Sequence, residues 1–76
     1  MITVKLYGLL RIESGIREKQ LEASAVKEVL AHLETCGIAR KDLNRCLILV
    51  NGSPATIRSK LTDGDTVVLM SPVAGG

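Results

Sequence analysis

The chain is poor in the features that mark several large classes of protein. It has no Phe, no Trp and a single Tyr among 76 residues, and its ten basic residues nearly balance its eight acidic ones. A nucleic-acid-binding domain of this size usually shows a basic stripe and stacking aromatic side chains. No apolar run approaches the ~18 residues that a membrane span needs. We therefore expect no nucleic-acid partner, no membrane anchor and, since no signal peptide is evident, a cytoplasmic protein.

The sequence also lacks the residue patterns that metal sites and redox sites usually require. The two cysteines, Cys36 and Cys46, form no C-x-x-C pair, and the single histidine is His32. A zinc site needs about four ligands, so these three residues fall short. We expect no metal and no bound cofactor. The cysteines are expected to be small apolar side chains in a reducing compartment, and His32 to lie on a solvated face of a helix.

Aliphatic residues are what the chain has in abundance. Hydrophobic residues make up 46% of the sequence, which is too many for a disordered chain. A chain of this length forms one small domain, and it cannot bury a core and also enclose a deep active site. The composition therefore predicts a small module that works with a larger partner.

Hydrophobic spacing predicts the elements of the first half. The alternation of apolar and polar residues over 1–7 predicts a half-buried strand. We expect residues 9–15 to lead into a turn, and residues 16–22 to form an edge strand that returns as a hairpin. A helix is predicted over 25–36, with Ser24 as its N-cap and Gly37 as the left-handed residue after its end. The apolar positions on which these predictions rest are Ile2, Val4 and Leu6 in the strand and Val26, Val29, Leu30 and Leu33 in the helix.

The second half predicts further strands separated by turns. A polar link over 38–45, anchored by Leu43, leads to the strand 46–50, which is apolar on both faces and therefore expected to be central. The following elements are a tight turn at Asn51-Gly52, a short strand over 54–57, a core position at Leu61, a turn over 62–65 and a last strand over 66–70.

This order of elements indicates an α+β domain. We expect a mixed four- to five-stranded sheet with one main helix packed on one face, and with the first and last strands side by side and parallel. The folded domain should cover residues 1–71, with 72–76 as a flexible Gly-Gly tail.

A sheet with one helix leaves one face for a partner. One assignment places Ile48, Val50, Val67 and Leu69 toward the helix. The opposite face then carries an aliphatic partner-binding patch made of Leu47, Leu49, Val68 and Met70. A slip of one residue would exchange the two sets, and ordinary exposed apolar side chains are the alternative to a binding patch.

The tail has unusual chemistry. Pro72, Val73, Ala74, Gly75 and Gly76 carry no charge, and two terminal glycines place no side chain near the carboxylate. Such a segment can enter a slot too narrow for any side chain, and five residues reach ~17 Å when extended. Because no nucleophile–base pair is apparent in the sequence, we expect the catalytic groups on partner proteins.

Four stretches carry a family resemblance. Residues 2–8 (ITVKLYG), 50–52 (VNG), 61–67 (LTDGDTV) and 72–76 (PVAGG) resemble the prokaryotic ubiquitin-like sulfur carriers of the MoaD/ThiS type, and the match spans nearly the whole chain. The resemblance implies a β-grasp fold. It also implies that an ATP-dependent enzyme of the MoeB/ThiF type adenylates Gly76, and that the adenylated Gly76 is then converted to a thiocarboxylate.

The ending PVAGG favours the small subunit of molybdopterin synthase, whose sulfur goes to a pterin precursor in the large subunit. Met70 and Ser71 depart from that type, which commonly has an aromatic residue and a second proline before the tail. The alternatives are a carrier that serves thiazole synthase in the thiamine pathway, a carrier for another sulfuration pathway, and a ubiquitin-like protein modifier joined through Gly76.

Overall fold

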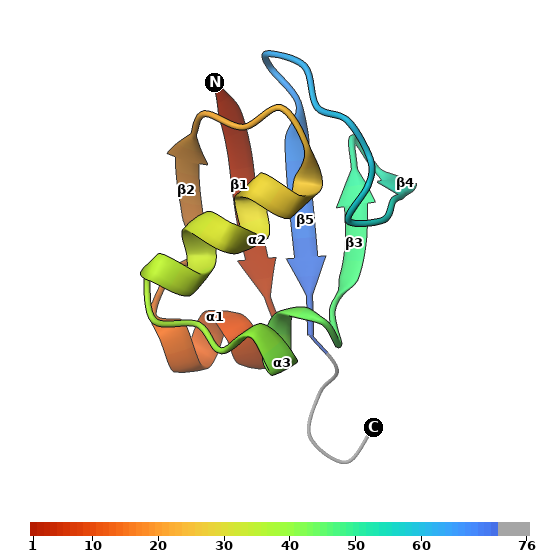
Figure 1. The fold of residues 1–76 in the computed structure, drawn as a ribbon. Coiled ribbons are helices and arrows are strands. Elements are labelled where there is room, and N and C mark those ends of the chain that lie inside the picture. The colour runs from red at the N-terminus through yellow and green to blue at the C-terminus, as the bar shows by residue number, and fades with distance from the viewer. Residues whose placement is uncertain (72–76) are drawn as a thin grey trace.

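Five strands form one mixed sheet in the order β2-β1-β5-β3-β4 (Figure 1). The computed structural model describes residues 1–71, so the predicted tail lies outside the described residues. The expected α+β class and sheet are confirmed. The elements in chain order are β1 (Ile2–Tyr7), α1 (Leu9–Ser14), β2 (Glu18–Leu21), α2 (Val26–Thr35), α3 (Arg40–Leu43), β3 (Leu47–Val50), β4 (Ser53–Pro54) and β5 (Thr66–Met70).

The parallel pair at the centre of the sheet is the predicted one. β1 and β5 run side by side, with Thr3 opposite Thr66 at one end and Tyr7 opposite Met70 at the other. β2 pairs antiparallel with β1 at one edge, as expected for residues 16–22. β3 pairs antiparallel with β5; α1 lies in the connection between β1 and β2, and α2 and α3 lie in the long connection between β2 and β3. Both β1 and β5 therefore end at the same side of the domain.

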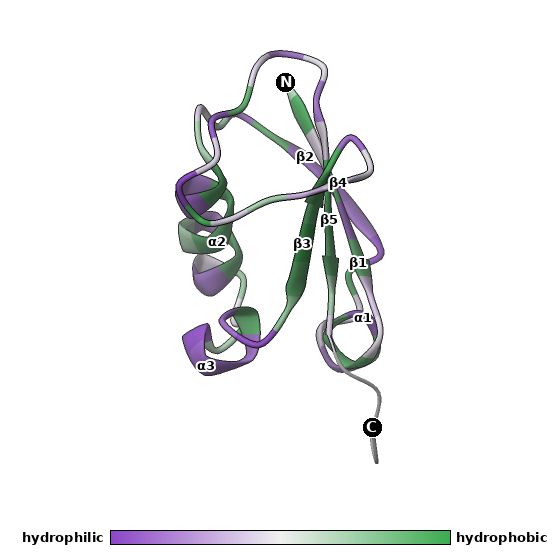
Figure 2. Cartoon of the chain, turned by 90° about the vertical axis from the view of Figure 1, so that its right-hand side faces the viewer, coloured by the Kyte–Doolittle hydropathy of each residue, from purple (hydrophilic) through white to green (hydrophobic). Residues whose placement is uncertain are grey.

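The core lies between the sheet and α2. Val4, Val67 and Leu69 from the sheet meet Val29 and Leu33 from the helix, and all five side chains are fully buried. Figure 2 shows α2 and α3 on one side of the sheet, while no described helix covers the middle of the other side. The alternation in residues 1–7 thus predicted correctly which side of β1 is buried, because side chains alternate faces along a strand.

The start of α2 corrects one prediction. Ser24 does not cap a first-turn N–H: the backbone N–H and the hydroxyl of Ser24 instead donate to the Glu28 carboxylate, the N–H at 2.7 Å. The N–H groups of Val26 and Lys27 donate to the carbonyls of Ser59 and Ile57, at 2.9 and 3.0 Å. A segment distant in the sequence therefore satisfies the free donors that a side-chain cap would otherwise serve.

The end of α2 follows the prediction. Gly37 has φ +98°, and its N–H donates to the Glu34 carbonyl, while the Ile38 N–H reaches back to the Leu33 carbonyl. This pair of bonds is a Schellman motif, which satisfies the last carbonyls of the helix. It turns the chain so that Ile38 is buried against the core.

Two short helices replace predicted irregular segments. Residues 9–15, expected to lead into a turn, form α1, which ends at Gly15 with φ +75°. The link 38–45 contains α3, and its Leu43 is buried as predicted. Each helix is too short for apolar spacing to reveal it, because one turn shows no repeat.

β3 has a strand on each side, β5 and the two-residue β4, so it is an interior strand as predicted, next to the edge of the sheet. One prediction about the strands in the second half is wrong. The segment 54–57 is not a strand beyond Pro54. The turn at Asn51-Gly52 is confirmed, with φ +51° and +84°, and it joins β3 to β4. β3 is apolar on both faces although it sits near the edge, because its outward side chains belong to an uncovered surface.

Candidate functional site

An apolar patch lies on the face of the sheet opposite α2, which we call the open face. The patch consists of Leu47 and Leu49 on β3 and Val68 and Met70 on β5, and the register pairs Leu47 with Met70 and Leu49 with Val68. Leu47 is 52% exposed and Met70 is 42% exposed, whereas Leu49 and Val68 are half-buried. This is the placement that the sequence predicted for these four residues.

The opposite set of side chains confirms the assignment of faces. Ile48, Val67 and Leu69 are buried, and Val50 is half-buried against the core. Since successive side chains of a strand point to opposite faces, the four patch residues must point outward. The alternative register, shifted by one residue, is therefore excluded for both strands.

Tyr7 extends the apolar patch onto β1, and sequence reasoning did not include it. Tyr7 lies opposite Met70 in the parallel pair and is 38% exposed. The signal was present in the sequence, because the alternation of residues 1–7 put Tyr7 on the face away from Ile2, Val4 and Leu6. The expected pairing of the first and last strands then brings it beside the end of β5.

The last described residue is anchored beside this patch. The Ser71 N–H and its hydroxyl both lie 3.3 Å from the Tyr7 carbonyl oxygen, to which they donate. The same hydroxyl oxygen accepts a bond from the Leu10 N–H at 3.0 Å. Ser71 is therefore held at the point where β1 ends and α1 begins, and residues 72–76 continue from that point.

Gly8 makes this anchorage possible. Its φ of +74° is unfavourable for any residue with a side chain. A Cβ at position 8 would lie 2.6 Å from the Ser71 carbonyl oxygen and 2.7 Å from its Oγ. The turn between β1 and α1 thus passes directly against Ser71, with no room for a methyl group. We call these contacts of Gly8, Leu10 and Tyr7 with Ser71 the root contacts.

Basic side chains border the patch on the side of β2. Lys5, Arg11 and Arg17, together with Tyr7 and Glu18, line a depression of about 250 Å³. Arg58 and Lys60 instead lie near the start of α2, around a different pocket. Positive charge close to the root of the tail therefore comes from β1, α1 and the start of β2.

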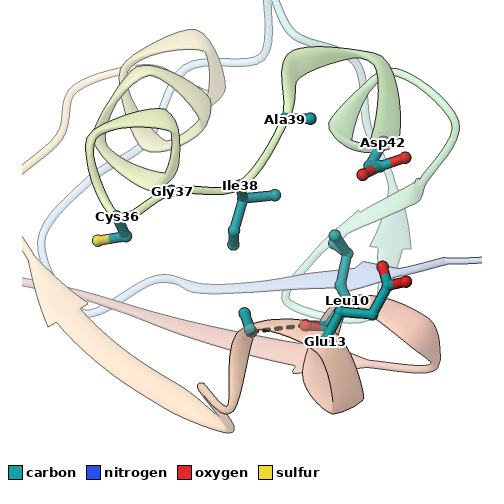
Figure 3. A pocket seen from close by; sticks show the side chains of 8 residues that line it. Leu10, Glu13, Cys36, Gly37, Ile38, Ala39 and Asp42 are labelled. Atoms are coloured by element: carbon teal, nitrogen blue, oxygen red, sulfur yellow. Dashed lines mark hydrogen bonds between the residues drawn. The ribbon is translucent and has the colours of Figure 1, made fainter.

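A pocket of about 270 Å³ lies between α1 and the segment that joins α2 to α3 (Figure 3). Cys36 stands at one end of it, and Asp42 and Glu13 stand toward the other. Both cysteines are free; Cys36 is exposed, and Cys46 is half-buried and donates to the Asp42 carbonyl at 3.2 Å. Burial, with a smaller contribution from the Asp42 charge, raises the pKa of the Cys46 thiol. Cys46 thus fits the expected role of a packing residue.

Within residues 1–71, no group of three or more His, Cys, Asp and Glu side chains could hold a metal ion. Among the described helices, none is both long and apolar enough to cross a membrane. The predicted tail residues, Pro72, Val73, Ala74, Gly75 and Gly76, lie outside the described residues. The described part of the site consists of the apolar patch and the root contacts.

A mixed sheet with a central parallel pair, crossed on one face by α2, is the ubiquitin-like β-grasp fold, as the solved structures show. Three of the similar structures are SAMP1 of Haloferax volcanii, a chain in the complex of subunits 1 and 2 of molybdopterin-converting factor from Helicobacter pylori, and a chain in the BexX/CysO complex of Amycolatopsis orientalis. Their TM-scores are 0.85, 0.74 and 0.74, and their identities are 22%, 26% and 20%. The matches cover 99%, 99% and 100% of this chain and 98%, 97% and 100% of the other.

The sequence itself defines the family. Residues 4–76 match the model of the ThiS family, so the match includes the apolar patch, the root contacts and the terminal glycines. The chain belongs to the ThiS family of ubiquitin-like sulfur carriers. A comparison with curated proteins gave no match.

Proposed function

We propose that this protein is a sulfur carrier in the biosynthesis of molybdopterin and that Gly76 is the residue that carries the sulfur. The observation on which the proposal rests is the family match, which runs through Gly75 and Gly76 at the end of the chain. The protein acts as a co-substrate and as the non-catalytic small subunit of a synthase, and its partners supply the catalytic groups.

The chemistry proceeds in two steps at the Gly76 carboxylate. The carboxylate oxygen attacks the α-phosphorus of ATP, which forms an acyl-adenylate and releases pyrophosphate. A sulfide-equivalent nucleophile then attacks the carbonyl carbon, the C–O bond to AMP breaks, and the thiocarboxylate remains on Gly76. The thiolate form of the nucleophile is the reactive one. Attachment to the protein then raises the local concentration of sulfur at the acceptor site.

The apolar patch is the surface on which we propose that partners dock. It lies next to Ser71, so a protein bound to Leu47 and Met70 would stand close to the origin of the tail. Five further residues span at most ~17 Å, so the docking surface and the reacting centre must be close together. Pro72, Val73 and Ala74 are proposed to contact the partner along this path, and Gly75 to pass through a narrow channel.

Two kinds of partner follow from this scheme. One is the ATP-dependent adenylating enzyme, and the other is the acceptor, which we propose to be the large subunit of molybdopterin synthase. The similarity to a chain in the Helicobacter pylori complex supports this acceptor, as does the PVAGG ending. Thiazole synthase is the alternative acceptor, and the growth requirement of a strain lacking the gene distinguishes the two pathways.

A second candidate function is protein modification through Gly76. The similarity to SAMP1 of Haloferax volcanii, a small archaeal modifier protein, favours it. In that case Gly76 would form an isopeptide bond with lysines of other proteins. Because Lys60 is the last basic residue, trypsin would leave residues 61–76 on each modified lysine. Lysines that carry this segment would support modification, whereas their absence together with a free thiocarboxylate would support the carrier.

Deletion of Gly76 tests the proposed function. The shortened protein should fold as the wild type does and should fail to restore molybdoenzyme activity in a strain that lacks the gene. The matched control is Lys60→Ala, since Lys60 lies near the start of α2 and away from the patch. Full restoration by the shortened protein would overturn the proposal.

A further inference from the structure

The contacts of Ser71 differ from those of an ordinary strand end. β5 ends at Met70, but the Ser71 N–H continues the bonding to β1 by donating to the Tyr7 carbonyl. The Ser71 hydroxyl also accepts a hydrogen bond from the N–H of Leu10, which lies 61 positions away in the sequence. The first N–H groups of a helix have no partner within the helix, so Ser71 supplies one from the other end of the chain.

We propose that the root contacts form a latch that fixes the start of the tail and that Ser71 is a positioning residue for the adenylation of Gly76. The inference rests on the proposed function. Ser71 does not touch the reacting atoms; it determines from which point of the domain the chain that ends in the Gly76 carboxylate is presented to the adenylating enzyme.

Gly8 is the second half of the latch. A Cβ at position 8 would meet the Ser71 carbonyl oxygen and Oγ at 2.6 and 2.7 Å, distances at which one of the two residues must move. Gly15 offers a matched comparison, because its φ is +75° against +74° for Gly8, and nothing lies within 4 Å of its Cβ position. The two glycines share the same backbone requirement and differ in contact with Ser71.

The latch has a quantitative consequence for binding. In the free protein the root contacts already fix Ser71. If Ser71 is released, a partner must fix the backbone of this additional residue on binding, and fixing the backbone of one residue corresponds to about a tenfold change in an equilibrium constant. Because this cost falls on the ground-state complex and the transition state alike, it should raise KM and leave kcat unchanged.

The test compares Ser71→Ala with the wild type as substrates of the ATP-dependent adenylating enzyme from the same organism. Adenylation is followed by pyrophosphate release. Ser71→Ala should raise the KM for the carrier by up to about tenfold with an unchanged kcat. Gly8→Ala should raise KM similarly, whereas Gly15→Ala should not. Because Gly8→Ala already displaces Ser71, adding Ser71→Ala to it should raise KM little further.

Amide hydrogen exchange supplies a readout that does not depend on adenylation. Ser71→Ala should speed exchange at Leu10, which loses its acceptor, and leave Gly15 unchanged, since the Gly15 N–H donates to the Arg11 carbonyl. Unchanged exchange at Leu10, or a KM for Ser71→Ala within about twofold of the wild type, would overturn the latch. Failure of the wild type itself to be adenylated would instead overturn the proposed function.

Discussion

On β3 and β5 the two faces of the sheet carry the same kinds of aliphatic side chain but have opposite environments. Toward α2, Val67 and Leu69 are fully buried. Their neighbours in the sequence, Val68 and Met70, point to the open face, where Met70 is 42% exposed. β5 is therefore apolar from Val67 to Met70, although its two faces have different surroundings.

The comparison shows that burial, rather than residue type, distinguishes the two faces of these strands. A fully buried aliphatic side chain stabilises the fold by about 1.5–3 kcal/mol relative to exposure. An exposed one in a monomer contributes little, and a contiguous group of them marks an interaction surface. The covered face holds the domain together, and the open face is the surface on which we propose that partners dock.

The largest expected effect is loss of stability from the covered face. Leu69→Ala should lower the free energy of unfolding by about 2–5 kcal/mol, because it leaves a cavity next to α2. Met70→Ala, one position along the same strand, should lower it by about 0.5 kcal/mol or less. Urea unfolding of both variants checks this contrast, and equal losses would show that the two faces do not differ as described.

A charge on the open face should affect binding more than stability. Leu47→Glu should weaken association with the adenylating enzyme by about 30-fold, because an apolar contact of about 2 kcal/mol is lost. The same substitution should leave the free energy of unfolding nearly unchanged. Gln20→Glu is the control: Gln20 lies on β2 opposite Thr3, on the open face but outside the patch. Titration calorimetry measures the affinity of both variants for the adenylating enzyme. If both bind equally weakly, a localised docking surface is excluded.

The corner between β1 and α1 should show a smaller and more specific effect. Gly15→Ala should cost about 1–2 kcal/mol in the free energy of unfolding, because alanine disfavours a positive φ. Gly8→Ala carries the same penalty and in addition pushes against Ser71, so it should cost more. Thermal and urea unfolding measure the difference, and a Gly8 variant that is no less stable than the Gly15 variant would contradict the close contact.

The smallest effect is a pH dependence at the end of the sheet away from the root contacts. Bonds from the Thr62 N–H and the Asn51 amide, both 2.9 Å long, hold the pKa of Asp65 below its usual value. The resulting stabilisation is present above the unfolded-state pKa, about 3.9, and is lost as the pH falls through the lower folded-state value.

Asp65→Asn should therefore flatten the dependence of stability on pH below about pH 4. Urea midpoints measured from neutral to acidic pH check this expectation. The Glu28 carboxylate, whose pKa is lowered mainly by the Ser24 N–H, stays in place in this variant and serves as the internal reference. If the urea midpoint of Asp65→Asn depends on pH as that of the wild type does, the assigned role of Asp65 is contradicted.

Local patterns in the sequence predicted most of the fold. Alternation gave the buried side of β1, because a strand has only two faces. For β3 and β5, which are apolar on both faces, it left two assignments, and the structure confirms the one that points Leu47 and Met70 outward. It could not reveal α1 or α3, which span too few turns to show a repeat. The cap predicted at Ser24 was wrong because the Ser59 and Ile57 carbonyls, supplied by the tertiary fold, occupy the donors.

The candidate site was predictable in part for the same reason. The apolar patch followed from alternation, and Tyr7 could have been added from the pairing of the first and last strands. The contact between Gly8 and Ser71 could not have been found, because it joins residues far apart in the sequence and depends on the path of the turn after β1. The roles of Pro72, Val73, Ala74, Gly75 and Gly76 stay predictions.

Intact-mass measurement of the reacted protein tests the central claim most directly. The purified protein is incubated with the adenylating enzyme, ATP and sulfide, and its mass is compared with that of a Gly76-deleted control. We predict a mass gain equal to the exchange of one oxygen for sulfur, located by fragmentation at Gly76 and absent from the control. An unchanged mass, or the same gain in the shortened protein, would contradict the account.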